Sequence, residues 1–285
     1  MNAPFSRSDL VNVPCDLCGD TEQSLLFDKE GFRHVRCENC GLVFVNPRLG
    51  SHQALQRTSG TGARGETELT RGQRRRFRKE LKVFAPYREL NRILEVGAGR
   101  GWFLEQAARA GWETWAVEIN SDALAHLRRK GISHILTEPA ETFDPPSGLV
   151  DGARIWDVIE HLESPRSALE RIHAALRPGG ILRLSTTNFA SLSRLINGPE
   201  WVYLNGSDHI QLFEPRTISM LLHSTGFSDI SIRTRSFNLR RKLYHPPRDL
   251  APPTTWLRPF RKIIDELIRF SWYGHQMIVT AVRCR

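Results

Sequence analysis

Short apolar runs alternate with amphipathic stretches over the last two thirds of the chain. Arg92–Val96 is an apolar run that predicts a buried parallel strand, and the spacing of apolar positions in Trp102–Ala108 predicts a helix after it. Later runs predict further strands at 113–117, 132–136, 150–156, 181–185 and 276–282. Strands that alternate with helices are typical of a doubly wound α/β fold.

A glycine-rich corner, Gly97, Gly99 and Gly101, follows the first predicted strand. Glycines there let the backbone approach a ligand, and the start of the next helix offers free N–H groups. Glu118 ends the second predicted strand, where an acid can accept hydrogen bonds from ribose hydroxyls. A nicotinamide enzyme is disfavoured, because its fingerprint G-x-G-x-x-G has a different glycine spacing.

Four of the five cysteines form two C-x-x-C pairs, which are Cys15, Cys18, Cys37 and Cys40. Two such pairs predict a closed tetrahedral zinc site with a structural role, and a rubredoxin-like iron site is the alternative. The chain shows no secretory signal and no long apolar run, so we expect a cytoplasmic location and reduced thiols.

Composition divides the chain into parts. We expect a zinc-ribbon module over residues 1–49, a flexible basic linker that opens a helix over 50–79, and the sheet domain over 80–285. Residues 238–272 form a basic insertion, in which we expect an amphipathic helix to begin near Pro259. This helix suits either packing or, through residues 256–273, peripheral membrane contact. The net charge of +9 fits anionic partners or plain solubility. The sequence does not indicate the oligomeric state.

The segment from Glu95 to Gly101 reads E-x-G-x-G-x-G and resembles motif I of the class I S-adenosylmethionine methyltransferases. The turn Leu176–Gly180 and the segment Ser219–Phe227 also resemble that family, in its order. The resemblance implies a seven-stranded, Rossmann-like sheet and a methyltransferase that uses S-adenosylmethionine. It also implies cofactor-binding residues, which are Glu95, Gly97, Gly99, Gly101, Glu118, Glu141 near the adenine, and Trp156.

Two features refine the resemblance. The ribbon followed by Gly41–Arg48 resembles a bacterial subgroup linked to methylation of sugars, glycans or natural products. Within the predicted fourth strand, Gly152 and Arg154 interrupt the apolar pattern that the family usually shows, and the sequence offers no reason for a central arginine.

Candidate chemistry lies just after that strand. On a helix, Asp157, Glu160 and His161 would share one face, and His209 follows later. We consider three interpretations: a histidine general base, a divalent metal site such as Mg²⁺ held by all four residues, or a structural helix start. The spacing D-x-x-E-H resembles the metal sites of small-RNA 2′-O-methyltransferases and of quinone-biosynthesis O-methyltransferases.

The expected function is O-methylation of a small-molecule, sugar or natural-product acceptor. One alternative is an RNA 2′-hydroxyl methyltransferase, which the positive charge and the ribbon favour. Another is a non-catalytic zinc-ribbon binding protein, against which the intact acidic and glycine positions argue.

Overall fold

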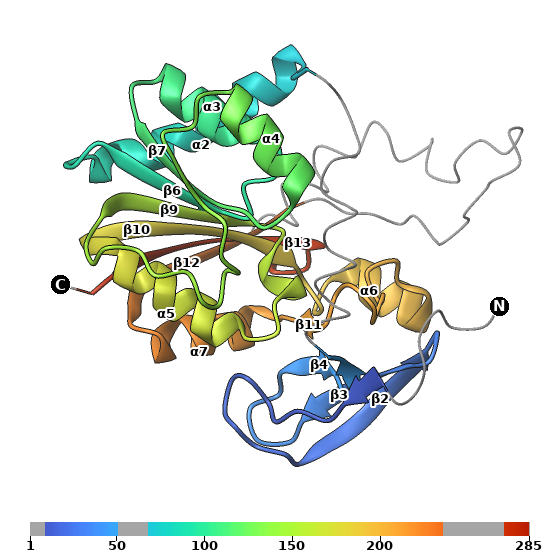
Figure 1. Cartoon of the computed structure of the whole chain (residues 1–285). Helices are drawn as coiled ribbons and strands as arrows, with labels where there is room; N and C mark the ends of the chain where they lie inside the picture. The colour runs from blue at the N-terminus through green and yellow to red at the C-terminus, as the bar shows by residue number, and fades with distance from the viewer. Residues whose placement is uncertain (1–8, 51–67, 236–270, 285) are drawn as a thin grey trace, which may run out of the picture.

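The computed structural model describes residues 9–50, 68–235 and 271–284. Figure 1 shows a helix-covered sheet with a smaller all-β part against one side of it. Most of the predicted linker and insertion, including most of the amphipathic helix expected from Pro259 onward, lies outside the described residues. No described helix is long and apolar enough to cross a membrane.

The central sheet has seven strands in the order β12-β13-β10-β9-β6-β7-β8. These strands are β6 (Arg92–Val96), β7 (Glu113–Val117), β8 (His134–Leu136), β9 (Val150–Trp156), β10 (Leu176–Thr187), β12 (Phe227–Arg235) and β13 (Gln276–Arg283). Only β13 runs antiparallel to its neighbours in this sheet. The seven-stranded doubly wound fold expected from the sequence is therefore confirmed.

Helices cover both faces of the sheet. One face carries α2 (Arg71–Phe84), α3 (Trp102–Arg109) and α4 (Ser121–Arg129), and the other carries α5 (Pro165–Ala175) and α7 (Pro215–Ser224) (Figure 1). Shorter turns connect these elements: η2 (Ala85–Tyr87), η3 (Ile159–His161), α6 (Leu192–Asn197) and η4 (Gly198–Glu200).

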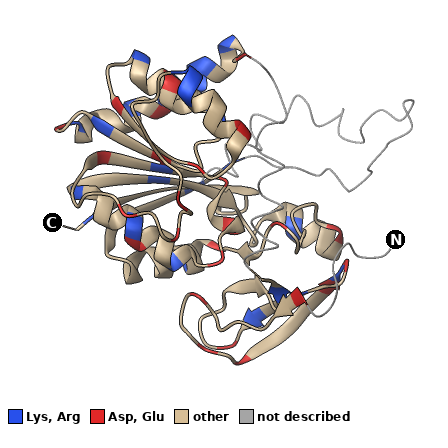
Figure 2. Ribbon diagram, viewed as in Figure 1, with Lys and Arg blue, Asp and Glu red and all other residues tan. Residues whose placement is uncertain are grey.

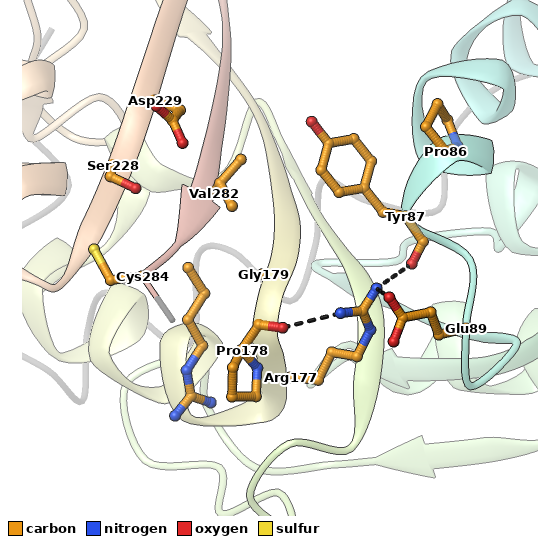
Figure 3. Close-up of a pocket in the computed structure, with 11 residues that line it drawn as sticks. Pro86, Tyr87, Glu89, Arg177, Pro178, Gly179, Ser228, Asp229, Val282 and Cys284 are labelled. Atoms are coloured by element: carbon orange, nitrogen blue, oxygen red, sulfur yellow. Dashed lines mark hydrogen bonds and ion pairs between the residues drawn. The ribbon is translucent and has the colours of Figure 1, made fainter.

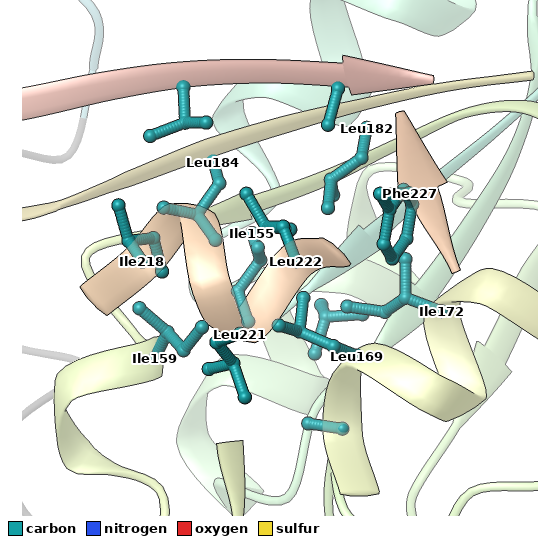
Figure 4. Packing of buried hydrophobic residues seen from close by; sticks show 14 of the residues in the cluster. Ile155, Ile159, Leu169, Ile172, Leu182, Leu184, Ile218, Leu221, Leu222 and Phe227 are labelled. Carbon is teal, nitrogen blue, oxygen red and sulfur yellow. The ribbon is translucent and has the colours of Figure 1, made fainter. Parts of the chain in front are cut away.

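On the face of the sheet that carries α5 and α7, the core lies between these two helices and the strands β9 and β10. Figure 4 shows Leu169 and Ile172 of α5 meeting Leu222 of α7 beneath Ile155 and Leu184 of the sheet. These side chains are fully buried. Burial of this size contributes about 1.5–3 kcal/mol for each large aliphatic side chain, so it is the main force that fixes both helices.

The N-terminal part forms a second sheet of order β11-β4-β3-β2. Three strands come from the ribbon, β2 (Gln23–Lys29), β3 (Phe32–Cys37) and β4 (Val43–Val45). The fourth, β11 (Gln211–Leu212), comes from the sheet domain and pairs antiparallel with β4. A small β1 (Leu10–Val11) and β5 (Arg48–Leu49) pair beside it. The ribbon sheet thus extends past the boundary expected at residue 49.

Arg154, the unexplained arginine of the fourth strand, forms a buried ion-pair network. Its guanidinium contacts Glu95 of the neighbouring strand β6 and lies 2.9 Å from Glu80 Oε1 of α2. All three residues are at most 7% exposed. Since an isolated buried charge is costly, the arginine and the two carboxylates depend on each other.

Gly152 has a packing role in the same strand. A Cβ atom at this position would lie 2.4 Å from Cδ1 of Phe84, the last residue of α2. Phe84 and Glu80 are four residues apart and share one face of the helix. Gly152 and Arg154, which interrupt the apolar pattern of the strand, are therefore the residues that contact α2.

We expect Arg154→Met to destabilise the fold by about 3–5 kcal/mol at pH 8, because it leaves two buried carboxylates without a counter-charge. Urea unfolding at several pH values measures this loss. Burial already raises the pKa of Glu95 to about 7. A carboxyl with a raised folded-state pKa gains stability as the pH falls, so the deficit should shrink at pH 5.

The matched control is Arg171→Met. Arg171 pairs with Asp144 at the surface, where the two side chains are 43% and 87% exposed. Exposed pairs contribute about 0–1 kcal/mol. Equal stabilities of the two variants at pH 8 would contradict the role assigned to the network.

Candidate functional site

The glycine corner lies at the carboxyl edge of the sheet, between β6 and α3. Gly97, Gly99 and Gly101 have φ values of 69°, 53° and 68°, which side-chain-bearing residues rarely adopt. A Cβ atom at Gly97 or Gly101 would collide with a neighbouring side chain, at 2.4 and 2.5 Å respectively. At Gly99 nothing lies within 4 Å of that position. The corner is thus packed on two sides and open at Gly99, as a backbone cradle for a ligand requires.

Glu118 faces this opening from the end of β7. Its carboxylate accepts hydrogen bonds from the backbone N–H of Gly99 at 2.6 Å and of Asn120 at 2.8 Å. The residue is 8% exposed. Ile119 beside it is 38% exposed, which is unusual for a large apolar side chain at the end of a core strand. An apolar surface next to a carboxylate suits a nucleoside. No sequence pattern had indicated that Ile119 belongs to the candidate site.

Glu95 offers a second polar atom at the corner. One carboxylate oxygen is paired with Arg154, while Oε2 is buried and has no hydrogen-bond partner among the described residues. Such an atom suits a cationic or N–H donor of a ligand. Trp156, at the end of β9, lies against Arg154 with its ring centroid 4.3 Å from the guanidinium carbon. These positions fit S-adenosylmethionine, whose methionine part carries an ammonium group.

Glu141 has a different environment. It follows β8, and its carboxylate accepts a hydrogen bond from the backbone N–H of Glu163 at 3.1 Å. Burial raises the pKa of Glu141, and hydrogen bonds from its own backbone N–H and from those of Glu163 and Ser164 oppose that effect. Because this carboxylate oxygen of Glu141 binds the backbone just before α5, the adenine contact expected for Glu141 stays a prediction.

Three of the predicted polar residues converge beyond the end of β9. Glu160 and His161 lie in η3, and His209 precedes β11. One ligand atom from each lies within 4.8 Å of the others, and the two imidazole ring centroids are 4.8 Å apart. Glu160 is 1% exposed and its Oε2 accepts a hydrogen bond from Thr186. The structure therefore brings together residues 49 positions apart in sequence.

The surroundings shift the pKa values of His161 and His209 in opposite directions. Burial opposes protonation of His161, but the Asp208 side chain and the Glu160 charge outweigh it and raise the pKa of His161 to about 9. Its Nδ1 lies 3.0 Å from an Asp208 carboxylate oxygen. Burial and the neighbouring His161 lower the pKa of His209 to about 4. Burial also raises the pKa of Glu160 to about 7.

Asp157 is placed differently from the helical face expected for it. Its φ of 52° ends the strand in a left-handed turn, and only the short η3 follows. Its Oδ1 accepts hydrogen bonds from Ser185 at 2.7 Å and Gln276 at 2.8 Å. Asp157 is not part of the group formed by Glu160, His161 and His209. The expectation of one shared helical face is thus wrong.

Several residues of this region escaped the sequence patterns. Tyr203 stacks on His209 and on His275, with centroid distances of 5.8 and 5.9 Å and an interplanar angle of 11° for both. Arg235, at the end of β12, donates a hydrogen bond to Gln276 at 2.7 Å. No sequence signal could find them, because they come from separate loops and strands that only the fold brings together.

The four ribbon cysteines form a second group with metal-binding geometry. Their sulfur atoms lie within 4.8 Å of one another. The Cys15–Cys40 and Cys18–Cys37 sulfur distances are 3.5 and 3.4 Å. Four thiolates at about 2.3 Å from one tetrahedral ion would lie about 3.8 Å apart, so the group fits such an ion. Burial raises the pKa of Cys40 to about 11, so without an ion this thiol is protonated at neutral pH.

A cavity of about 810 Å³ lies at the opposite, amino edge of the sheet. Figure 3 shows Tyr87, Glu89 and Arg177 on one side of it and Asp229 and Val282 on the other. Arg177 pairs with Glu89 and Asp151 and donates to the Tyr87 carbonyl oxygen. Since ligands of doubly wound sheets bind at the carboxyl edge, this cavity is not the candidate site.

Basic and acidic residues are spread over both parts of the molecule (Figure 2). The arginine-rich run predicted to open a helix lies in α2, where most of its basic side chains are exposed. The capping box of Thr70 and Gln73 begins this helix.

The profile of a family described as "Methyltransferase domain" matches residues 69–232, which is more than half of the chain. The chain belongs to this methyltransferase family. Two relatives are named ubiquinone biosynthesis O-methyltransferase. The one from Azoarcus sp. (strain BH72) is 25% identical over 179 residues, 55% of this chain and 73% of the relative. The one from Dinoroseobacter shibae is 27% identical over 199 residues, 64% and 78% of the two chains.

Solved structures share the fold. A SAM-dependent methyltransferase from Archaeoglobus fulgidus aligns with a TM-score of 0.51 and 24% identity, over 74% of this chain and 94% of that one. Phosphoethanolamine N-methyltransferase 2 of Haemonchus contortus, solved with S-adenosyl-L-methionine, aligns with a TM-score of 0.56 and 20% identity, over 85% and 62%. These likenesses show the shared fold. The family match over residues 69–232 makes the chain a methyltransferase, in agreement with the class I, S-adenosylmethionine-dependent resemblance of its motif, and the non-catalytic alternative is set aside.

We expect Glu118→Ala to weaken binding of S-adenosylhomocysteine at least tenfold, because hydrogen bonds to a charged group contribute roughly 1.5–3 kcal/mol. Isothermal titration calorimetry measures the affinity. Glu170→Ala, on the exposed side of α5, is the matched control and should bind as the wild type does. Unchanged affinity in Glu118→Ala would remove this residue from the cofactor site.

Proposed function

We propose that this methyltransferase methylates a hydroxyl group of a small-molecule acceptor, with Glu160, His161 and His209 as its polar centre. The observation that carries the proposal is the convergence of these three side chains within 4.8 Å at the carboxyl edge of the sheet. The glycine corner opens at the same edge, as the ends of β6 and β9 are neighbours. The O-methyltransferase names of the relatives support the choice of oxygen as the methylated atom.

The bound cofactor supplies a methyl group on a sulfonium. The protein has to hold the acceptor oxygen in line with it and to receive the hydroxyl proton. In this proposal Glu95 faces the ammonium group of the cofactor and Glu118 accepts hydrogen bonds from its ribose hydroxyls. The histidine cluster then faces the acceptor, since it follows β9 directly.

The cluster also fits a divalent cation. One carboxylate oxygen and two imidazole nitrogens are ligands that several first-row divalent metals accept, and Mg²⁺ would use the carboxylate with water. Such a cation would lower the pKa of a coordinated acceptor hydroxyl. Asp157 is not needed for this set, in contrast to the four-residue site expected from the sequence.

The four-cysteine group is proposed to hold zinc in a structural role. All four ligand positions are filled by thiolates, which leaves no open position for a substrate. Asp20 and Leu42 accept matching hydrogen bonds from the first cysteine N–H of each pair, at 2.9 Å in both. This repeated backbone geometry orients both pairs toward one point.

We expect His161→Ala and His209→Ala to lower the methyl-transfer rate at least a hundredfold, because a positioned acid or base typically contributes about 10²–10⁴-fold. The assay follows transfer to a panel of phenols, sugars and RNA, with affinity for S-adenosylhomocysteine unchanged. The control His223→Ala is exposed on α7 and should keep the wild-type rate.

A chelator separates the two chemistries. Inhibition of the wild type by chelator and recovery with Mg²⁺ or Mn²⁺ would support the cation, whereas full activity would leave a histidine base. Zinc content is measured in the same samples, so that loss of ribbon metal is recognised. Wild-type rates in both alanine variants would rule out the proposed centre.

We expect Cys37→Ser to lose its zinc and to unfold the ribbon at lower temperature, because metal binding and folding of such modules are coupled. Elemental analysis and thermal unfolding measure both effects. Cys284→Ser is the matched control, as Cys284 is exposed and outside the group. Retention of one zinc per chain in Cys37→Ser would contradict the four-thiolate assignment.

A further inference from the structure

The two segments that carry His161 and His209 are both hydrogen-bonded to the ribbon. His209 is followed at once by Ile210 and β11, and β11 is the edge strand of the ribbon sheet. Gln211 pairs with Phe44 and Leu212 with Val43 of β4. The position of the His209 segment is therefore set by ribbon backbone.

Ile210 links the ribbon directly to the other half of the cluster. Its carbonyl oxygen accepts a hydrogen bond from Val45 N–H of the ribbon at 2.9 Å. Its own N–H donates to the carbonyl oxygen of Glu160, also at 2.9 Å. One residue thus joins β4 to η3, which holds Glu160 and His161.

The first cysteine pair holds the chain on the far side of His161. The carboxylate of Asp16, between Cys15 and Cys18, accepts hydrogen bonds from Ser164 Oγ at 2.7 Å and from Arg166 N–H at 2.8 Å. The Arg166 side chain donates to the carbonyl oxygens of Asp16 and Leu17, at 3.1 and 2.5 Å. The contact lies at the start of α5, three residues after His161.

The loop before His209 also lies on the ribbon. A Cβ atom at Gly206 would lie 2.4 Å from Cβ of Phe32 in β3, so this loop passes directly over the strand. Further along, Arg36 pairs with Glu214 at 2.9 Å. Three of the ribbon cysteines, Cys15, Cys37 and Cys40, belong to the same buried hydrophobic core as Ile155 and Ile159, which lie close to the histidines.

We propose that the ribbon is the positioning element of the acceptor site: the Cys15–Cys18 turn and strand β4 fix the two segments that carry His161 and His209. None of the ribbon hydrogen bonds named above involves the glycine corner or Glu118, whose carboxylate binds the N–H groups of Gly99 and Asn120. Loss of the ribbon contacts should therefore disturb the acceptor half and leave the cofactor half intact.

The inference rests on the proposed function only for what the histidines do. Its test uses a readout that needs no methyl transfer, which is hydrogen–deuterium exchange of the full chain followed by mass spectrometry. Asp16→Ala removes the contact with α5 and leaves all four cysteines in place. Arg171→Ala, further along α5 and exposed, is the control.

We expect Asp16→Ala to keep its zinc and to bind S-adenosylhomocysteine within twofold of the wild type. Exchange should become faster by roughly tenfold or more in peptides over 159–166, while peptides over 92–118 keep their protection. If an acceptor has been identified, kcat/KM for it should fall about 10- to 100-fold, as for other residues that orient a reacting group. Asp16→Asn, which keeps one acceptor oxygen, should recover part of the loss.

Arg166→Ala tests the contact between the first cysteine pair and α5 from the α5 side. Removal of zinc from the wild type tests whether strand β4 holds the His209 segment. If Asp16→Ala loses its zinc, Arg166→Ala decides the matter, because it leaves the whole ribbon sequence unchanged. Removal of zinc should speed exchange over 207–212 as well. Exchange at 159–166 and 207–212 equal to that of Arg171→Ala would overturn the inference. So would equal loss of protection over 92–118, since the ribbon would then stabilise the whole chain without selectivity.

A failure to find any acceptor would count against the proposed function, and the exchange data would still decide the role of the ribbon. The opposite outcome is also distinguishable. If exchange is unchanged in Asp16→Ala and Arg166→Ala while His161→Ala is inactive, the positioning role is rejected and the O-methyltransferase proposal stands.

Discussion

The buried guanidinium of Arg154 joins the two central strands and the first helix of the sheet domain. It forms ion pairs with Glu95 on β6 and Glu80 on α2, and it lies against the ring of Trp156. Three charged groups in a sheet interior are tolerable only together, because each would otherwise lack both water and a counter-charge. The strand that ends in the glycine corner is thereby fixed relative to the strand that leads to the histidine cluster.

From that fixed centre, the two halves of the candidate site are built by different means. The cofactor half depends on backbone geometry, with three glycines at positive φ and a carboxylate that binds the N–H groups of Gly99 and Asn120. The acceptor half depends on side chains from distant segments. The ribbon is hydrogen-bonded to both segments, through Ile210 and through the carboxylate of Asp16.

In our proposal, the ribbon is accordingly a positioning part of the acceptor site. Its sheet is completed by β11, and its first cysteine pair contacts the start of α5. An edge strand that pairs with another segment satisfies backbone groups that would otherwise stay exposed. In our proposal, this pairing is the route by which the ribbon would influence the acceptor side without contributing a reacting group.

The sequence by itself determined the strands from β6 to β10, the glycine corner with Glu118, and the four-cysteine group. Each depends on local spacing: apolar runs, glycines at fixed offsets, and C-x-x-C pairs. Only the tertiary structure decided why Arg154 lies in a central strand, that Asp157 turns toward Ser185 and Gln276, and that Tyr203 and His275 stack beside His209. It also decided that β11 belongs to the ribbon. These features join residues up to 178 positions apart, as in the Arg36–Glu214 pair, and no local pattern records which distant segments will meet when the chain buries its apolar surface.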